Sequence, residues 1–132
     1  MSDLLNEIKN LSKDLFYLSE GMHPMKSEKI KLKNKQSSTD FICKKYNCTT
    51  NQINKLHTDF FFQKVSNSTD SLDVLLNKNA ENFSKLYTFI QEHFSEISVY
   101  RIEKGTQIPI AIFLSNNKEY LFLLETLAEE TG

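Results

Sequence analysis

Apolar positions along the chain predict helices in its first two thirds and strands in its last third. In the N-terminal segment the apolar residues recur at helical spacing, which predicts an amphipathic helix over residues 3–17. Gly21 and Pro24 follow, and both residue types interrupt helices, so a turn is expected there. A second stripe at helical spacing predicts a longer helix over residues 79–94; its members are Ala80, Phe83, Leu86, Tyr87, Ile90 and Phe94.

Between these two helices the pattern changes twice. From Lys29 to Lys35 every second residue is a lysine, with Ile30 and Leu32 between them. This period of two predicts a strand with one charged face, and lysines are typical of an edge strand. Residues 38–57 then read as helix–turn–helix, with Ser37 or Ser38 as the first N-cap and a capping-box spacing from Thr49 to Gln52.

The following "DFFF" and the polar run after it are less regular. Phe60, Phe61 and Phe62 form a cluster that is expected to anchor part of the core, and "SNSTDS" reads as a loop. Three β-branched or apolar runs end the chain ("ISVYRIE", "IPIAIFL" and "YLFLLETL"), separated by "KGTQ" and "SNNK". They predict a three-strand, mostly antiparallel meander. The fold class is therefore α+β, with helices packed on a twisted sheet in one domain, 1–132.

Composition is typical of a globular protein. The 132 residues are 39% hydrophobic and 25% charged, with a formal net charge of -1. This balance does not favour a general attraction to nucleic acid or to a membrane surface. The N-terminal segment lacks the layout of a signal peptide and no apolar run reaches the ~18 residues of a membrane span, so a cytoplasmic location is expected. Cys43 and Cys48 are then expected to be free thiols.

No motif in the chain supports catalysis. The histidines are scattered over three elements without ligand spacing, and the cysteines are not spaced as CxxC. Neither a nucleophile motif nor a glycine-rich phosphate loop is present. The sequence thus indicates a non-enzymatic protein with no cofactor, no metal site of its own and no small-molecule substrate.

Two surface features could bind a partner. The lysine face from Lys29 to Lys35, with the helix–turn–helix-like segment, would suit nucleic acid, although basic support is thin. Acidic residues at the ends of elements would suit a basic or metal-bearing protein; these are Glu20, Asp70, Glu129 and Glu130.

Several short motifs, taken in order, resemble the nuclease A inhibitor family. They are "KDLFYLSEGMHP", "DFFFQKVSNSTDS", "VYRIE", "IPIAIFL" and "YLFLLETLAEET", and together they span essentially the whole chain. The resemblance implies a three-layer α/β/α sandwich and a protein that inhibits a Mg²⁺-dependent, DNA/RNA non-specific nuclease by plugging its active site. It also implies that Thr131 approaches the Mg²⁺ of the nuclease, while Glu20 and Asp70 contact residues around it.

The chain departs from the family pattern at two places. Ser71 stands where the family has a tryptophan after the aspartate, which removes an aromatic contact, and Leu72 is next to it. Gly132 follows the threonine on which the family pattern ends. The last strand is expected to finish at about Leu127, and the protruding tip to begin at Glu129 and to include Glu130, Thr131 and Gly132. Two alternatives therefore stay open: a regulatory adaptor with this fold and another protein target, and a small nucleic-acid-binding module.

Overall fold

A five-stranded antiparallel sheet forms the centre of the molecule. The computed structural model describes residues 3–19, 21–31, 38–67, 72–115 and 120–129. The strand order in the sheet is β3-β7-β6-β5-β4. The strands are β3 (Lys26–Lys31), β4 (Ile53–Leu56), β5 (Glu96–Ile102), β6 (Gln107–Ser115) and β7 (Tyr120–Glu129). Strands β5, β6 and β7 form the predicted meander, and β3 lies at the predicted edge. Lys33 and Lys35 of the predicted strand lie outside the described residues.

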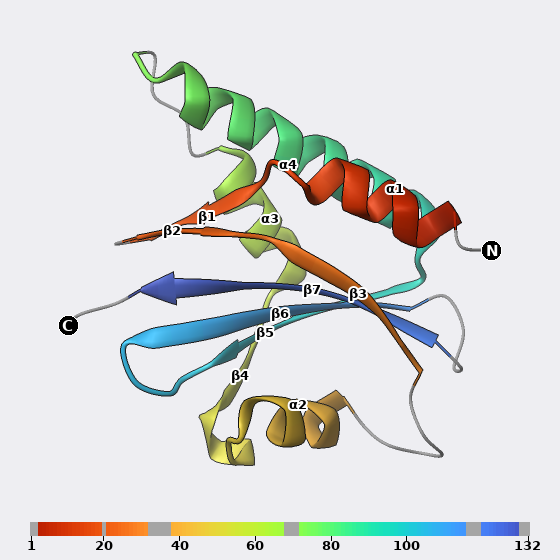
Figure 1. Cartoon of the computed structure of the whole chain (residues 1–132), viewed down its shortest axis with the longest axis vertical. Helices are drawn as coiled ribbons and strands as arrows, with labels where there is room; N and C mark the ends of the chain where they lie inside the picture. The colour runs from red at the N-terminus through yellow and green to blue at the C-terminus, as the bar shows by residue number, and fades with distance from the viewer. Residues whose placement is uncertain (1–2, 20, 32–37, 68–71, 116–119, 130–132) are drawn as a thin grey trace.

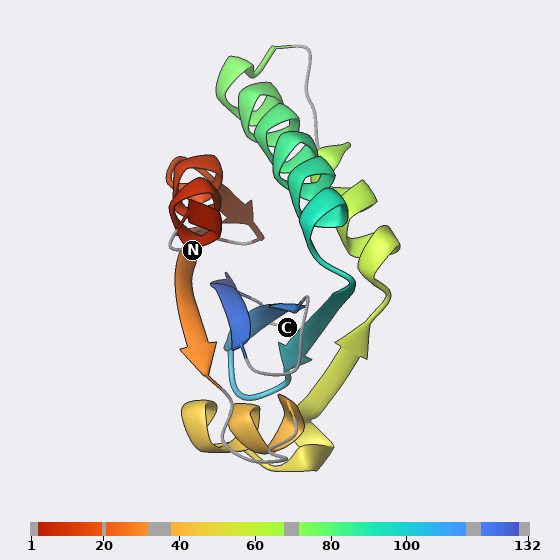
Figure 2. The same ribbon diagram turned by 90° about the vertical axis from the view of Figure 1, so that its right-hand side faces the viewer.

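Helices cover both faces of this sheet, which confirms the predicted three-layer α/β/α arrangement and its N-terminal helix. One layer holds α1 (Asp3–Ser12), α3 (Thr58–Ser66) and α4 (Val74–His93). The other holds α2 (Ser38–Tyr46) (Figure 1). Figure 2 shows the sheet between the two layers.

The alternation of side chains along the strands explains why the sheet is covered on both sides. In β7, Phe122 and Leu124 belong to the large core under α1, α3 and α4, whereas Leu123 belongs to a smaller core under α2. Ile42 of α2 is fully buried in that smaller core. A strand buried on both faces is apolar throughout, as "YLFLL" is.

The first helix is shorter than predicted. It ends at Ser12, whose Oγ donates to the carbonyl of Ile8 at 2.7 Å, and the amide of Leu15 donates to the carbonyl of Ser12. Leu15 is buried as the helical pattern implied, but it reaches the core from the turn. The next residues pair as a small antiparallel hairpin, β1 (Phe16–Leu18) with β2 (Met22–Pro24).

The helix–turn–helix prediction for residues 38–57 is wrong in its second half. Helix α2 is present, but one 3₁₀ turn (Thr50–Gln52) and β4 take the place of a second helix. Ile53 packs in the smaller core and Leu56 in the larger one. Their spacing of three mimics a helical stripe because the two partly buried residues lie on opposite faces of β4. The predicted Thr49–Gln52 pair is nevertheless made, since the amide of Thr49 donates to Gln52 Oε1 at 3.0 Å.

Helix α2 ends through a left-handed residue. Asn47 has φ 52, and the amide of Cys48 donates to the carbonyl of Cys43 at 3.2 Å, as in a Schellman motif. The ammonium of Lys104 donates to the carbonyls of Tyr46 and Asn47 at 3.0 and 2.7 Å. These contacts satisfy carbonyls that the helix end leaves unpaired. Cys43 and Cys48 are both free thiols, as expected.

The phenylalanine cluster lies on α3 and faces two ways. Phe61 and Phe62 are buried, but Phe60 is 69% exposed, so its predicted core role is wrong. Consecutive helical residues are turned by about 100°, and three in a row therefore cannot share one face. Among the described residues no helix is long and apolar enough to cross a membrane.

Candidate functional site

All six residues assigned to the partner surface from sequence lie outside the described residues. They are Glu20, Asp70, Ser71, Glu130, Thr131 and Gly132. The structure describes their neighbours along the chain, and these neighbours show where each segment is attached to the fold. Ser19 and Gly21 flank the first position, Asn67 and Leu72 flank the second segment, and Glu129 precedes the third.

The β1–β2 hairpin presents the position of Glu20 at its turn. The amide of Ser19 donates to the carbonyl of Gly21 at 2.9 Å, which closes the turn around that position. Leu18 and Met22 are opposite each other in the register and are 48% and 54% exposed. The hairpin therefore carries apolar side chains into solvent on both sides of its turn.

The end of β7 lies directly against this hairpin. The amide of Glu129 donates to Ser19 Oγ at 2.8 Å, and Glu129 pairs with Gln107 of β6. Glu129 is thus the last residue of the strand, and the expectation that the protruding tip begins at Glu129 is wrong. The strand extends further than expected because β6 and the hairpin both offer it partners.

The side chain of Glu129 is held by two hairpin residues. Glu129 Oε1 lies 2.7 Å from His23 Nε2, with side-chain exposures of 35% and 20%. A Cβ on Gly21 would lie 2.5 Å from Glu129 Oε2, so only glycine leaves room for the carboxylate in this position. Three residues earlier along β7, Thr126 Oγ1 donates to the carbonyl of His23 at 3.2 Å.

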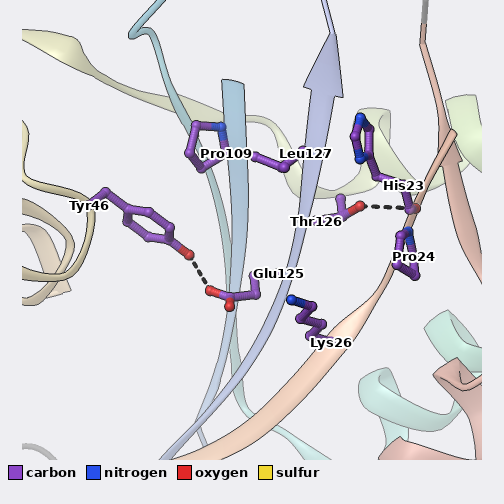
Figure 3. Close-up of a pocket in the computed structure, with 8 residues that line it drawn as sticks. All are labelled: His23, Pro24, Lys26, Tyr46, Pro109, Glu125, Thr126 and Leu127. Atoms are coloured by element: carbon purple, nitrogen blue, oxygen red, sulfur yellow. Dashed lines mark hydrogen bonds between the residues drawn. The ribbon is translucent and has the colours of Figure 1, made fainter. Parts of the chain in front are cut away.

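A cavity of about 260 Å³ adjoins this contact on the α2 side of the sheet. Figure 3 shows its walls, which come from β2, β3, β6, β7 and the end of α2. The lining residues are His23, Pro24, Lys26, Tyr46, Pro109, Glu125, Thr126 and Leu127. The sheet face is open here because α2 ends at Tyr46 and does not extend over Pro109 and Leu127.

A polar cluster borders the same cavity. The hydroxyl of Tyr46 donates to Glu125 Oε2 at 2.5 Å, and the ammonium of Lys45 lies 3.2 Å from Glu28 Oε1 and 3.8 Å from Glu125 Oε2. Burial raises the pKa of Tyr46 above its usual value, and its hydrogen bond to Glu125 raises it further. Tyr46 therefore remains a neutral hydrogen-bond donor that fixes the Glu125 carboxylate.

The flank of the second candidate segment is apolar and exposed. At the start of α4, Asp73 Oδ1 accepts from the amide of Leu76 at 2.9 Å and caps the helix. Around it Leu72, Val74 and Leu75 are 93%, 82% and 62% exposed. Figure 1 shows this helix start on the same left-hand side as the hairpin and the end of β7, but well above them.

The structure thus brings the flanks of the first and third candidate segments together and leaves the flank of the second apart. Sequence reasoning did not find the residues that make this join, Ser19, His23 and Glu129, because His23 and Glu129 are 106 positions apart. Gly21 after "LSE" is a local signal in the sequence, but by itself it predicts only a turn that ends the first helix. Within the described ranges no cluster of three or more histidine, cysteine or acidic side chains could hold a metal ion.

Comparison with known proteins supports the ordered resemblance. No curated protein sequence matches the chain. The family model described as nuclease A inhibitor-like protein matches residues 2–131, which is nearly the whole chain. The match spans both helix layers, the sheet, the hairpin and the strand end described above. The chain therefore belongs to the nuclease A inhibitor-like family.

Proposed function

We propose that this protein is a non-enzymatic inhibitor that binds a Mg²⁺-dependent, sugar-non-specific nuclease and blocks its active site with its C-terminal tail and acidic loops. Family membership supports an inhibitor role in general. The contact residues are Glu20, Asp70, Ser71, Glu130, Thr131 and Gly132. The partner is a protein, and the inhibitor contributes no metal and no cofactor of its own.

One observation carries the proposal furthest. The hydrogen bond from the Glu129 amide to Ser19 Oγ holds the residue before the tail against the residue before Glu20. The residues that adjoin Glu20 and the tail are far apart in sequence but lie in contact. This contact supports the proposal that the acidic loop and the tail bind one active site together.

The chemistry of the target explains why such a surface would bind. A nuclease active site that holds a divalent cation and basic side chains is built to stabilise phosphate oxygens. Carboxylates and a hydroxyl are hard oxygen ligands of the kind that Mg²⁺ accepts. They imitate the anionic charge of the substrate but offer no phosphodiester bond to cleave.

The two departures from the family pattern bear on affinity and target. Ser71 cannot supply the buried aromatic contact of a tryptophan, and Gly132 follows the threonine on which the family pattern ends. The exposed Leu72 next to Ser71 gives the segment an apolar side chain that could bury against the partner. These departures favour a second candidate, a regulatory adaptor that keeps the fold but binds a different protein.

A competition experiment distinguishes the two candidates. Cleavage of DNA and RNA by nuclease A and by a panel of other Mg²⁺-dependent, sugar-non-specific nucleases is titrated with the wild-type chain. Active-site blocking predicts inhibition with both substrates and an apparent Ki that rises with substrate concentration. Glu20→Gln should weaken inhibition by about tenfold, while the matched control Glu92→Gln, on the exposed side of α4, should not. Binding without inhibition, or no effect on any nuclease, overturns the proposal.

A further inference from the structure

We infer that Ser19, Gly21, His23 and Glu129, called here the Glu129 cluster, position the hairpin against the end of β7 and thereby set the affinity of the inhibitor. His23 and Glu129 are the positioning residues. The inference rests on the proposed function. It adds residues that do not contact the nuclease themselves but position the residues that do.

The hairpin needs such contacts because it is small. Strands β1 and β2 have three residues each and lie outside the five-stranded sheet. A two-stranded hairpin has marginal stability by itself, so its orientation depends on what it packs against. At the turn end, the contacts to β7 include the hydrogen bond between Ser19 and Glu129.

The side chains of the cluster hold the same contact in a second way. His23 Nε2 and Glu129 Oε1 are 2.7 Å apart and only partly exposed, and such a pair involving a carboxylate is among the stronger hydrogen bonds. The carboxylate lies over the Cα of Gly21, where a methyl group would displace it. The absence of a side chain at Gly21 thus provides the space that the Glu129 carboxylate occupies.

The residues of the Glu129 cluster are direct neighbours in the chain of the proposed contact residues. Glu20 lies between Ser19 and Gly21, and residues 130–132 follow Glu129. A change of about 1 Å in the relative position of two contacting groups is enough to lose much of their joint effect. The cluster is therefore expected to fix how the hairpin and the tail meet the nuclease.

The first test is a double-mutant cycle with Gly21→Ala and Glu129→Ala. Gly21→Ala should raise Ki about tenfold, because the new methyl displaces the Glu129 carboxylate from His23. In the Glu129→Ala background the same substitution should have no further effect, since nothing is left to displace. Equal effects of Gly21→Ala in both backgrounds would overturn the inference.

The second test replaces His23 in two ways. His23→Leu removes the donor, whereas His23→Gln keeps an N–H that can reach Glu129. The expected result is a Ki raised about tenfold for His23→Leu and largely restored for His23→Gln, with the thermal midpoint of the two variants within a few degrees. Equal Ki values for the two variants would contradict a positioning role.

A third measurement needs no nuclease and tests the Glu129 cluster separately from the proposed inhibition. Amide hydrogen exchange of Glu129 reports the bond to Ser19 Oγ directly. Gly21→Ala and His23→Leu should speed its exchange about tenfold and leave Leu123, in the middle of β7, unchanged. Faster exchange without any inhibition by the wild type refutes the proposed function but not the cluster, whereas unchanged exchange refutes the cluster itself.

Discussion

Asn79 of α4 pairs with both backbone polar groups of Phe16 in β1. The amide of Phe16 donates to Asn79 Oδ1 and Asn79 Nδ2 donates to the carbonyl of Phe16, each at 3.0 Å, and Asn79 is 5% exposed. On this edge β1 has no neighbouring strand among the described residues, and the side-chain amide of Asn79 makes the hydrogen bonds that such a strand would make. It fixes the start of the hairpin to the helix layer.

Asn79→Leu should therefore lower the free energy of unfolding by about 2–4 kcal/mol, because it leaves two partly buried backbone groups unpaired. Urea unfolding measures this change. Asn82→Leu, three residues further along the same helix and less buried, is the control and should change stability by less than about 0.5 kcal/mol. Equal losses for the two variants would show that the Phe16 contact contributes nothing specific.

The α2 layer gives a second prediction about stability. Ile42 is fully buried between α2 and the sheet, so Ile42→Ala should cost about 2–4 kcal/mol in the free energy of unfolding. Lys44→Ala, on the exposed side of α2, should cost almost nothing. Chemical denaturation compares them, and a loss below about 1 kcal/mol for Ile42→Ala would mean that α2 does not complete the core.

Elements with a long, one-sided pattern could be predicted from the sequence. The stripe of α4 and the apolar runs of β5, β6 and β7 predict the correct type of structure, because each stripe or run is at least partly buried along most of its length. Predictions failed where a short segment touches both cores or turns away from its pattern. Ile53 and Leu56 in β4 have helical spacing yet lie in different cores, and Leu15 continues a helical stripe after α1 has ended.

The candidate site was less predictable for a different reason. Its described contacts join a hairpin near the start of the chain with a strand near its end. The pairing of His23 with Glu129 depends on the register of β7 against β6 and on the space left by Gly21. Neither quantity has a local pattern in the sequence. The segments and positions that the ordered family motifs name remain a prediction.

The environment of Tyr87 should make the free energy of unfolding depend on pH in the alkaline range. Its hydroxyl donates to Asp59 Oδ1, and burial together with that bond raises the pKa of Tyr87 to about 12. A pKa raised on folding stabilises the protein fully below the unfolded value of about 10, and this contribution is lost as the pH rises towards 12. The stability difference between wild type and Tyr87→Phe should thus be constant below pH 10 and shrink above it. A difference that stays constant to pH 12 would contradict the assignment.

Binding to nucleic acid provides a test against the remaining alternative. Residues 53–56 form a strand, so the second helix of the predicted helix–turn–helix does not support the lysine face of β3 as a recognition helix. Titration of random duplex DNA across a salt series should give no measurable affinity even at low salt. Tight binding with a steep salt dependence would instead indicate phosphate contacts and favour the nucleic-acid-binding module.

The most direct measurement of the central claim is the Ki of the chain lacking Thr131 and Gly132, against a nuclease that the full chain inhibits. The tail-blocking account predicts at least a ~100-fold loss of inhibition with an unchanged thermal midpoint, because the deletion begins two residues after Glu129 and leaves the described pairing of β7 with β6 in place. Deleting Gly132 alone is the matched variant, and it should strengthen inhibition if the terminal carboxylate acts with the Thr131 hydroxyl. Full potency after removal of both residues would contradict the account.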